Sequence, residues 1–411
     1  MRLWMDPSPL RDRGFRAVFV GRTIAVFGLG FVLVAVPLQV YTLTGSTAGV
    51  AAVTATVGIA AFAGTLAGGV LADRHDRRVV IVAARAAAGL GYAGLTVNAF
   101  APDPAMWAIY TCGVVDGVAG GISSTALMAA TPNLVPREKL AAAGALMQLM
   151  VTIGTVAAPA LGGLLVATAG FGGNYAVCTA TAVVTVGSLL RLPALPAGGT
   201  GRSGPRLVAA GFAFAVRDRH VGPVLAVGIV GMVTAGWTVL LPEFTTAVLG
   251  GGPGVVGLLY AAPAAGAMLG SLTSGWTGAV VRLGPVLLLT TLLACVGLAA
   301  AGATTSALVT GLALAAFGFG RAVCDVVRYT AVLESTPDAL RGRVSAVWSA
   351  QLVVSAAVGA GVAGAVAGLL PVRWAVTGYG LVALAVLLLV AVVVPPVRAL
   401  RRTAAGGVVG D

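Results

Sequence analysis

Long apolar stretches separated by short polar segments restrict the fold of this chain more than any other feature. A helix rising 1.5 Å per residue crosses about 30 Å of hydrocarbon in about 20 residues. The sequence holds twelve stretches of about that length or more, near 17–43, 48–72, 79–100, 105–131, 140–168, 174–191, 221–248, 254–281, 284–302, 306–334, 343–370 and 374–396. Because helices satisfy their own backbone hydrogen bonds in lipid, the pattern predicts an all-α integral membrane protein with twelve transmembrane helices.

Composition agrees with a lipid environment. Charged residues make up 9% of the chain and the mean hydropathy is +1.00, whereas soluble domains hold about 25% charged residues. The 59 glycines suit helices that pack closely in a membrane, where small residues line helix contacts. Glycines four residues apart occur at Gly64 and Gly68, and at Gly113, Gly117 and Gly121.

The net charge of +12 would suggest nucleic-acid binding in a soluble protein. Here, with a cytoplasmic N-terminus, the arginines and the lysine outside the spans fall on one side of the membrane, and Arg373 alone falls on the other. This distribution follows the positive-inside rule. It predicts a plasma-membrane protein with both termini in the cytoplasm, in contact with lipid and with no nucleic-acid partner.

The chain divides into two similar parts. Proline, glycine and arginine interrupt the hydrophobic pattern at 192–206, which predicts halves at 1–191 and 221–411 joined by a cytoplasmic linker at 192–220. Residues 207–218 within this linker are expected to form an interfacial helix. The segment from Thr131 resembles that from Thr336, an offset of about 205 residues, so the halves are expected to be pseudo-symmetric six-helix repeats, as in one class of transporters.

A polar loop between the second and third spans carries a recognisable pattern. The segment GVLADRHDRR resembles the G-x-L-x-D-R-x-G-R-R signature of the major facilitator superfamily, with Asp76 in place of a glycine; the matching residues are Gly69, Leu71, Asp73, Arg74, Arg77 and Arg78. The resemblance implies the major facilitator fold and a conformational latch at the cytoplasmic surface. Asp73 is expected to face a helix N-terminus and the arginines to meet carboxylates or carbonyls.

The fifth span indicates a direction of transport. Its segment GTVAAPALGG resembles the signature of the drug:proton antiporter branches through Gly154, Pro159, Gly162 and Gly163, with Ala158 in place of the middle glycine. The small residues share one helical face, so an ordinary packing contact explains the same geometry. The resemblance implies an exporter.

Segments along nearly the whole chain, among them FRAVFVGRTI, VAVPLQV and LMAATPNLV, are similar to the bacterial enterobactin exporter group. This resemblance implies a proton-coupled antiporter that exports a siderophore. Neighbouring groups export macrolides and other drugs, so a macrolide or multidrug efflux antiporter is the alternative. A non-transporting sensor or scaffold is a further alternative, because duplicated helices can lose transport.

Seven ionisable residues fall inside expected spans: Arg22, Arg85, Asp116, Glu243, Arg321, Asp325 and Arg328. Each costs about 2.5–3.5 kcal/mol at mid-membrane on insertion scales, so each should face protein or water. We expect Asp116 to couple transport to protons, with Glu243 and Asp325 as further candidates. Asp116 could instead be a structural carboxylate bonded to Arg22. Arg22 and Arg85 are expected to be structural.

The tenth span carries a charged stripe, because Arg321, Asp325 and Arg328 share one helical face. It is either a self-neutralising ion cluster or part of a site for an anionic substrate, and the enterobactin exporter pattern lacks it. Gln148 and Gln351 occupy corresponding places in the two halves and could bind substrate. The aromatic residues Trp237, Trp348 and Phe317 could stack on an aromatic ligand or simply pack.

Other functional classes find little support in the sequence. There is no phosphate-binding loop of the GxxxxGK[ST] kind, and the four cysteines and two histidines show neither metal-site nor catalytic spacing. We therefore expect no enzyme activity, no metal and no cofactor. The expected partners are a small-molecule substrate and protons, and the protein is expected to function as a monomer.

Overall fold

The computed structural model describes residues 11, 13–130, 140–191, 218, 221–336 and 338–402. These residues are almost entirely helical and separate into two compact units. Unit 1 comprises residues 1–202 with 251–261, and unit 2 comprises 203–250 with 262–411. Apart from Asp218, the expected linker and its interfacial helix lie outside the described residues, so the division at 192–220 stays a prediction.

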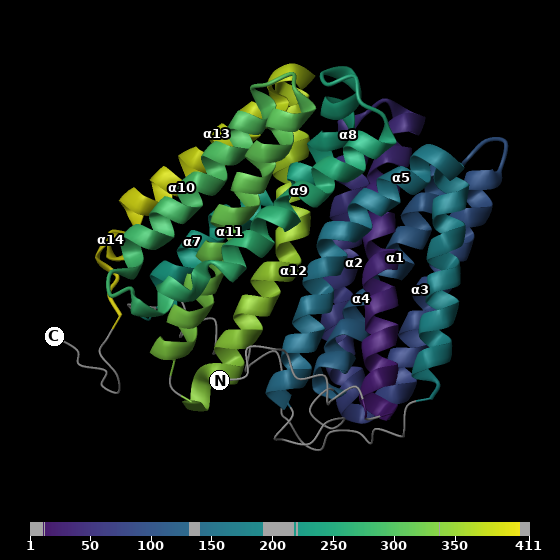
Figure 1. Ribbon diagram of the computed structural model, residues 1–411, viewed down its shortest axis with the longest axis horizontal. Coiled ribbons are helices and arrows are strands. Elements are labelled where there is room, and N and C mark those ends of the chain that lie inside the picture. The colour runs from purple at the N-terminus through teal and green to yellow at the C-terminus, as the bar shows by residue number, and fades with distance from the viewer. Residues whose placement is uncertain are drawn as a thin grey trace. The chain divides into compact units, whose positions relative to one another are not determined.

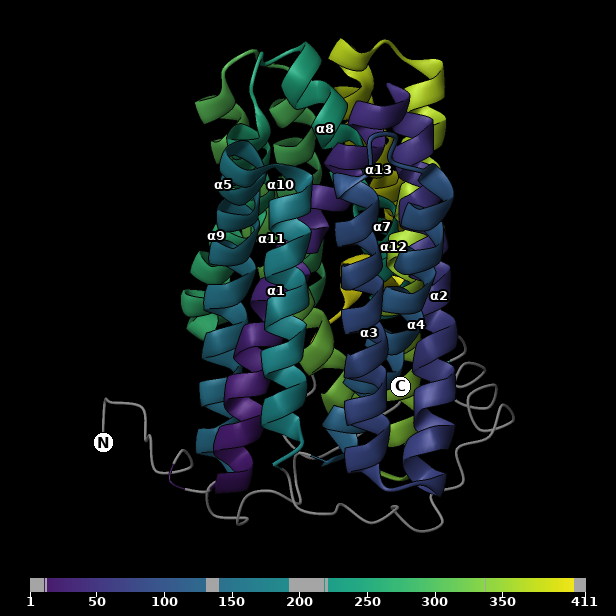
Figure 2. The same cartoon turned by 90° about the vertical axis from the view of Figure 1, so that its right-hand side faces the viewer.

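Unit 1 is a bundle of long helices, which Figure 2 shows from the side. They are α1 (Arg13–Thr44), α2 (Thr47–Arg74), α3 (Arg77–Phe100), α4 (Met106–Ala130) and α5 (Leu140–Leu189). A straight helix of the 50 residues in α5 would be about 75 Å long at 1.5 Å per residue. Instead α5 reverses at Gly170, whose φ of 69° is the left-handed value that glycine tolerates. We call its two parts the first arm (140–169) and the second arm (171–189).

Unit 2 contains α7 (Val221–Thr234), α8 (Trp237–Ala247), the second half of α9 (Pro253–Leu272), the 3-10 helix η4 (Ser274–Ala279), α10 (Leu283–Gly302), α11 (Ala307–Ser335), α12 (Asp338–Leu369), α13 (Val372–Val393) and α14 (Pro396–Ala399) (Figure 1). The first half of α9 belongs to unit 1. Helices α7 and α8 are two pieces of one span, because the chain is interrupted only at residues 235 and 236.

Ten described segments are long and apolar enough to cross a membrane. One of them, 146–189, turns back at Gly170 and therefore crosses twice. Helix α4, with 25 residues, is long enough to be the remaining span. The prediction of an all-α protein with twelve transmembrane helices is confirmed.

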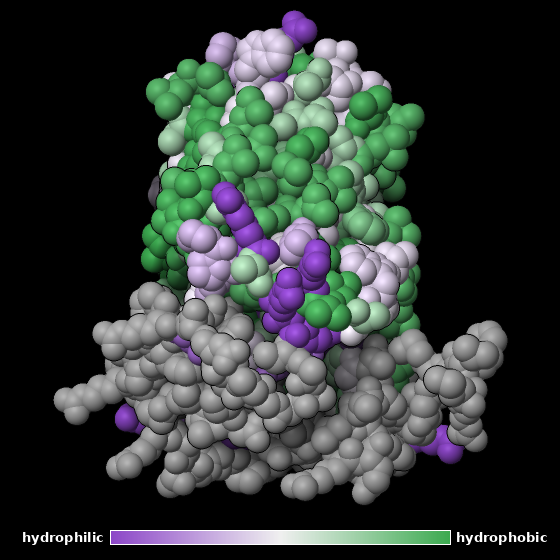
Figure 3. Space-filling model, turned by 90° about the vertical axis from the view of Figure 1, so that its left-hand side faces the viewer, coloured by the Kyte–Doolittle hydropathy of each residue, from purple (hydrophilic) through white to green (hydrophobic). Residues whose placement is uncertain are grey.

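The outer surface is apolar, as lipid contact requires. Leu369 is 83% exposed and Leu272 is 75% exposed, values that a soluble protein would rarely show for many large side chains together. Figure 3 shows one face on which hydrophobic residues form a broad band, with hydrophilic residues gathered toward one end.

Glycines allow α2 and α4 to pack backbone against backbone. A Cβ added to Gly64 would lie 2.2 Å from the carbonyl oxygen of Val118, and one added to Gly68 would lie 2.7 Å from Cα of Ile122. From the other side, a Cβ on Gly121 would lie 2.4 Å from the carbonyl oxygen of Ala61. The glycines spaced four apart are therefore a helix contact, as their sequence spacing indicates.

Candidate functional site

The loop between α2 and α3 is built around helix ends. Helix α2 ends at Arg74, and Asp76 is the N-cap of α3, its Oδ1 accepting a hydrogen bond of 2.8 Å from the backbone N–H of Arg78. Aspartate is among the best N-cap residues, which explains why it stands at the glycine position of the family pattern. The Arg78 guanidinium donates to the carbonyl oxygen of Leu190, at the end of α5.

The other latch residues lie around this turn. Arg74 is exposed in the last turn of α2, while Asp73 and Arg77 are half-buried and engaged in interactions. A Cβ added to Gly69 would meet nothing within 4 Å, so packing does not require glycine there. The structure thus ties α3 to the end of α5 through Arg78.

The small residues of the fifth span form a contact with α1. A Cβ on Gly154 would lie 2.4 Å from Cγ1 of Val26, and one on Gly162 would lie 2.9 Å from Cα of Phe31. Between them, the methyl group of Ala158 lies over Gly30, where an added Cβ would come within 2.4 Å. The small residues of the motif therefore pack against α1, as the four-residue spacing of Gly154, Ala158 and Gly162 allows.

The end of the same motif contacts the first half of α9 within unit 1. A Cβ added to Gly163 would lie 2.6 Å from Cα of Gly257, and one added to Gly257 would lie 2.6 Å from the carbonyl oxygen of Pro159. Pro159 and Gly163 thus take part in a second close helix contact.

Asp116 on α4 is bonded to a tyrosine. Its Oδ1 accepts a hydrogen bond of 2.7 Å from the hydroxyl of Tyr92 on α3, whose residue is 6% exposed. Asp116 forms no ion pair with Arg22, the structural alternative that the sequence left open; its hydrogen-bond partner is Tyr92. Arg85 is close enough for its charge to act on Asp116. The sequence reasoning missed Tyr92, although Arg85 and Tyr92 are seven residues apart and share one face of α3.

The charged stripe of α11 forms ion pairs. Asp325 lies 3.0 Å from Nη1 of Arg328 and 3.9 Å from Nε of Arg321. One carboxylate between two guanidinium groups is largely neutralised. The stripe therefore contains an ion cluster, but the side chains of Arg321 and Asp325 are still 29% and 36% exposed, so both sequence interpretations stay open.

Arg328 is 4% exposed and its donors are used by protein groups. Nε donates to the carbonyl oxygen of Val224 on α7 at 3.1 Å, and Nη2 donates to Oε1 of Gln351 on α12 at 2.8 Å. The guanidinium also lies 4.5 Å from the ring centroid of Trp348. Gln351 in turn donates to the carbonyl oxygen of Leu225 at 3.1 Å. Arg328 and Gln351 therefore fasten α7 to α11 and α12.

Gly228 makes room for this pair. A Cβ at that position would lie 1.9 Å from Nη2 of Arg328 and 2.3 Å from Oε1 of Gln351. Sequence reasoning did not single out Gly228, because one glycine among 59 carries no signal of its own.

Arg321 supports the interruption between α7 and α8. The N–H of Ala235 bonds to Met232 O, which leaves the carbonyl of Gly231 without its usual helical partner. Nη1 of Arg321 donates to that oxygen at 2.9 Å and to the Thr234 hydroxyl at 3.0 Å.

Tyr379 of α13 completes the interruption. The N–H of Gly236 donates to the Tyr379 hydroxyl at 2.9 Å, and that hydroxyl also bonds to the carbonyl oxygen of Val233. Trp237, the next residue, packs edge-on against the buried Phe317, with ring centroids 6.1 Å apart. Tyr379 is a further contributor that the sequence analysis missed.

The remaining candidates stand apart from these clusters. Gln148 is exposed on α5, unlike Gln351, so the two glutamines have different surroundings. Glu243 follows Pro242 in α8, is half-buried and is engaged in an interaction. Among the described residues, no three His, Cys, Asp or Glu side chains are arranged to hold a metal ion.

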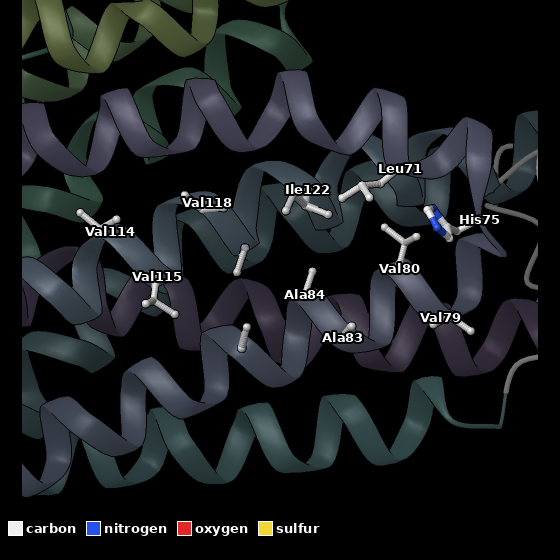
Figure 4. Close-up of a pocket in the computed structure, with 12 residues that line it drawn as sticks. Leu71, His75, Val79, Val80, Ala83, Ala84, Val114, Val115, Val118 and Ile122 are labelled. Atoms are coloured by element: carbon white, nitrogen blue, oxygen red, sulfur yellow. The ribbon is translucent and has the colours of Figure 1, made fainter.

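A groove of about 550 Å³ lies in unit 1 (Figure 4). Side chains from α2, α3 and α4 converge on it, and all of them are apolar except His75 at one end. None of the expected proton-coupling or substrate-binding residues lines it. Binding sites usually add a few polar groups that orient the ligand, so this groove does not replace the candidate residues above.

Comparison with known proteins identifies the family. Residues 6–406 match the model of the family described as transmembrane secretion effector. The chain belongs to this family of the major facilitator superfamily. It is 39% identical over 398 residues to the enterobactin exporter EntS of Escherichia coli O1:K1 / APEC, covering 95% of this chain and 94% of that protein. The protein of the same name from Shigella boydii serotype 18 shows the same identity and coverage.

Solved structures share the fold. A point mutant of the nucleoside transporter NupG matches with a TM-score of 0.77 at 14% identity, covering 93% of this chain and 99% of that one. A bacterial homologue of the iron transporter ferroportin matches with a TM-score of 0.70 at 17% identity, covering 94% and 99%. The chain is therefore a multi-pass inner-membrane transporter of the major facilitator fold, and not an enzyme.

Proposed function

We propose that this transporter exports a siderophore-like small molecule from the cytoplasm and is driven by the inward movement of protons. The observation that carries the proposal is the 39% identity to enterobactin exporters over 95% of the chain. The small-residue face on α5, from Gly154 to Gly162, adds the exporter-type motif. Substrate and coupling ion are treated separately below, since different residues support each.

The exposed part of the α11 stripe suits an anionic, aromatic substrate. The side chain of Arg321 is 29% exposed and that of Asp325 is 36% exposed, whereas Arg328 is held on all sides. A catecholate offers oxygen acceptors to a guanidinium group and a ring that can stack on Trp348 or Trp237. We therefore assign substrate contact to Arg321 and the two tryptophans, and a supporting role to Arg328, Gln351 and Phe317.

Asp116 is the carboxylate best suited to carry the proton. Asp325 is neutralised by two arginines, but Asp116 shares a hydrogen bond with a neutral phenol. A tyrosine hydroxyl donates to a carboxylate and accepts from a carboxylic acid, so Tyr92 suits both protonation states. Each proton that enters contributes about 2.3 kcal/mol per 100 mV of membrane potential.

Transport in proteoliposomes tests the proposal. Vesicles with an imposed proton gradient would be loaded with a catecholate siderophore or with a macrolide, and the gradient then collapsed in a parallel sample. We expect gradient-dependent movement of the siderophore and loss of that dependence in Asp116→Asn. The matched control is Asp103→Asn, because Asp103 is exposed in the loop between α3 and α4.

Each outcome that contradicts the proposal would support a different function. Movement of the macrolide alone would replace siderophore export by drug efflux, and movement that ignores the gradient would remove proton coupling. If neither compound moves in protein that folds and inserts, the sensor or scaffold alternative takes over.

We also propose that both termini face the cytoplasm and that the monomer is the working unit. The excess of arginine on one side of the spans supports the orientation. Labelling of single cysteines introduced beside Arg78 and Arg373 tests it, since only one of the two sites should react from outside intact cells.

A further inference from the structure

Unit 2 carries three exposed arginines at one end of two neighbouring spans. Helix α10 begins directly after Arg282, whereas Arg398 and Arg401 follow the end of α13, which packs against α10. Among the described residues, none of these three guanidinium groups forms a hydrogen bond or an ion pair. We call the three residues the arginine patch.

The backbone holds two members of the patch opposite each other. Arg282 and Arg401 form an isolated antiparallel bridge. Beside it, the N–H of Arg402 donates to the carbonyl oxygen of Val281 at 2.8 Å. Residues directly opposite in an antiparallel pair have Cβ atoms about 4.5–5.5 Å apart and share one face. The two guanidinium groups therefore extend from neighbouring points on the same side of the bridge.

Helix α14 brings Arg398 to the same end of α10. The N–H of Gly284, in the first turn of α10, donates to the carbonyl oxygen of Leu400 at 3.0 Å. A Cβ added to Gly284 would clash with the carbonyl oxygen of Val397, so α14 lies directly against this turn. Arg398 is in the last turn of α14 and thus joins the other two arginines.

The charge of the patch is not balanced by neighbouring carboxylates. Arg402 differs in this respect, because its Nε and Nη2 each donate to the Glu334 carboxylate at 2.8 Å. That carboxylate is thereby engaged by Arg402. Like charges directly opposite each other in an antiparallel pair are destabilising, so an anion bridging Arg282 and Arg401 would relieve their repulsion.

The patch borders the lipid-facing surface. Val281 and Leu289 near the start of α10, and Val392 and Val393 in the last turn of α13, are all exposed. Figure 1 shows α10, α13 and α14 on its left, and Figure 3, which faces that side, shows strongly hydrophilic residues beside the hydrophobic band. The ends of spans lie at the level of the lipid headgroups. A ligand here would meet both guanidinium groups and apolar side chains.

We propose that the arginine patch binds the phosphate of an anionic phospholipid, of which phosphatidylglycerol is the model, with its acyl chains against the exposed apolar residues of α10 and α13. Guanidinium groups bind phosphate oxygens through paired N–H···O bonds, and basic groups at the ends of spans bind anionic headgroups. The apolar border favours a lipid over a soluble phosphate. This inference goes beyond the proposed function and depends on neither the substrate nor the orientation of the termini, because phosphates lie at both membrane surfaces.

The test measures lipid binding without a transport step. The full-length protein in a neutral detergent is titrated with phosphatidylglycerol or phosphatidylcholine at constant ionic strength, and the complexes are resolved by native mass spectrometry. Each arginine near the phosphate should contribute about fivefold to affinity, equivalent to about 1 kcal/mol. We therefore expect the first phosphatidylglycerol to bind about 100-fold more tightly than the first phosphatidylcholine.

Variants assign the preference to the patch. Arg401→Gln should weaken phosphatidylglycerol binding about fivefold and leave phosphatidylcholine binding unchanged, and glutamine at all three patch positions should abolish the preference. The matched control removes the same charge from three exposed arginines at the ends of spans in unit 1, Arg16, Arg74 and Arg191. This control should keep the wild-type preference.

Equal affinities of the wild-type protein for the two lipids would overturn the proposal. An equal loss in the unit 1 control would also overturn it, because net charge alone would then explain the preference. Displacement of phosphatidylglycerol by inorganic phosphate at constant ionic strength would identify a soluble phosphate as the ligand and overturn the lipid. If the triple patch variant does not fold, Arg401→Gln decides through its expected fivefold loss. Failure of siderophore transport would affect none of these measurements.

Discussion

Replacement of Gly228 by alanine tests whether α7 is held by the Arg328–Gln351 pair. The new methyl group would lie 1.9 Å from Nη2 of Arg328, and ordinary contact begins at 3.4 Å, so the guanidinium must move by about 1.5 Å. The Arg328–Gln351 hydrogen bond of 2.8 Å does not survive such a shift. The surrounding bonds to Val224 and Asp325 leave the side chain little freedom to adjust.

The destabilisation expected for Gly228→Ala follows from the hydrogen bonds that are lost and the helix propensity that is gained. A hydrogen bond to a charged group contributes about 1.5–3 kcal/mol, and displacing Arg328 weakens the bond to Val224 as well. Alanine in place of glycine favours the helix by about 0.5–1 kcal/mol. We expect Gly228→Ala to lower the free energy of unfolding by about 2–3 kcal/mol after this gain.

Gly231 provides a matched control on the same helix. A Cβ added there meets nothing within 4 Å, so Gly231→Ala keeps the propensity gain without the crowding. Both variants would be compared by equilibrium unfolding in the same detergent. The difference should shrink in a Gln351→Ala background, because the partner of Arg328 is then already absent. Equal stabilities of Gly228→Ala and Gly231→Ala would refute this account of the cluster.

Four further changes, the first with a control variant, test other contacts. Gly68→Ala should destabilise the α2–α4 contact by about 1–3 kcal/mol as an overpacked site, whereas Gly69→Ala, with open space around its Cβ, should be neutral in the same unfolding assay. Gly30→Ala should likewise destabilise, because its methyl group would lie 2.4 Å from that of Ala158; wild-type stability of this variant would contradict the close α1–α5 contact. The bond to Glu334 raises the pKa of Arg402, but the pair is partly exposed, so Arg402→Gln should cost under about 1 kcal/mol and the cost should fall with added salt. Tyr92→Phe removes the hydrogen bond to Asp116 and should alter the pH dependence of transport more than protein stability, which parallel transport and melting measurements would separate.

Much of the fold was predictable because membrane insertion leaves few choices. Length and hydropathy were enough for the twelve spans, including the 140–168 and 174–191 pair on either side of Gly170. The spacing of Gly64 and Gly68 indicated a close helix contact, since only small residues let helices approach so closely in lipid, but it did not indicate that the partner is α4.

The polar contacts were harder to predict. Sequence spacing placed Arg321, Asp325 and Arg328 on one face, because that relation lies within a single helix. The partners of Arg328 on α7 and α12, and the role of Tyr379 at the break after Thr234, depend on how separate helices pack. No periodicity within one helix carries that information.

The two units preserve one feature of the repeat and change another. In unit 2, Cβ atoms added to Gly266 and Gly270 of α9 would lie 1.8 and 2.9 Å from backbone oxygens of α11, as the glycines of α2 meet α4 in unit 1. Yet the repeat offset of about 205 residues places Asp116 opposite Arg321, a residue of the opposite charge. Both units build this backbone contact with glycines, whereas their charges at this position differ. A charge that only one unit carries at this position is a candidate for binding a substrate or a proton. Arg321 also donates to the Gly231 carbonyl and the Thr234 hydroxyl, so Asp116 is the position at which a change of charge should alter transport before it alters folding.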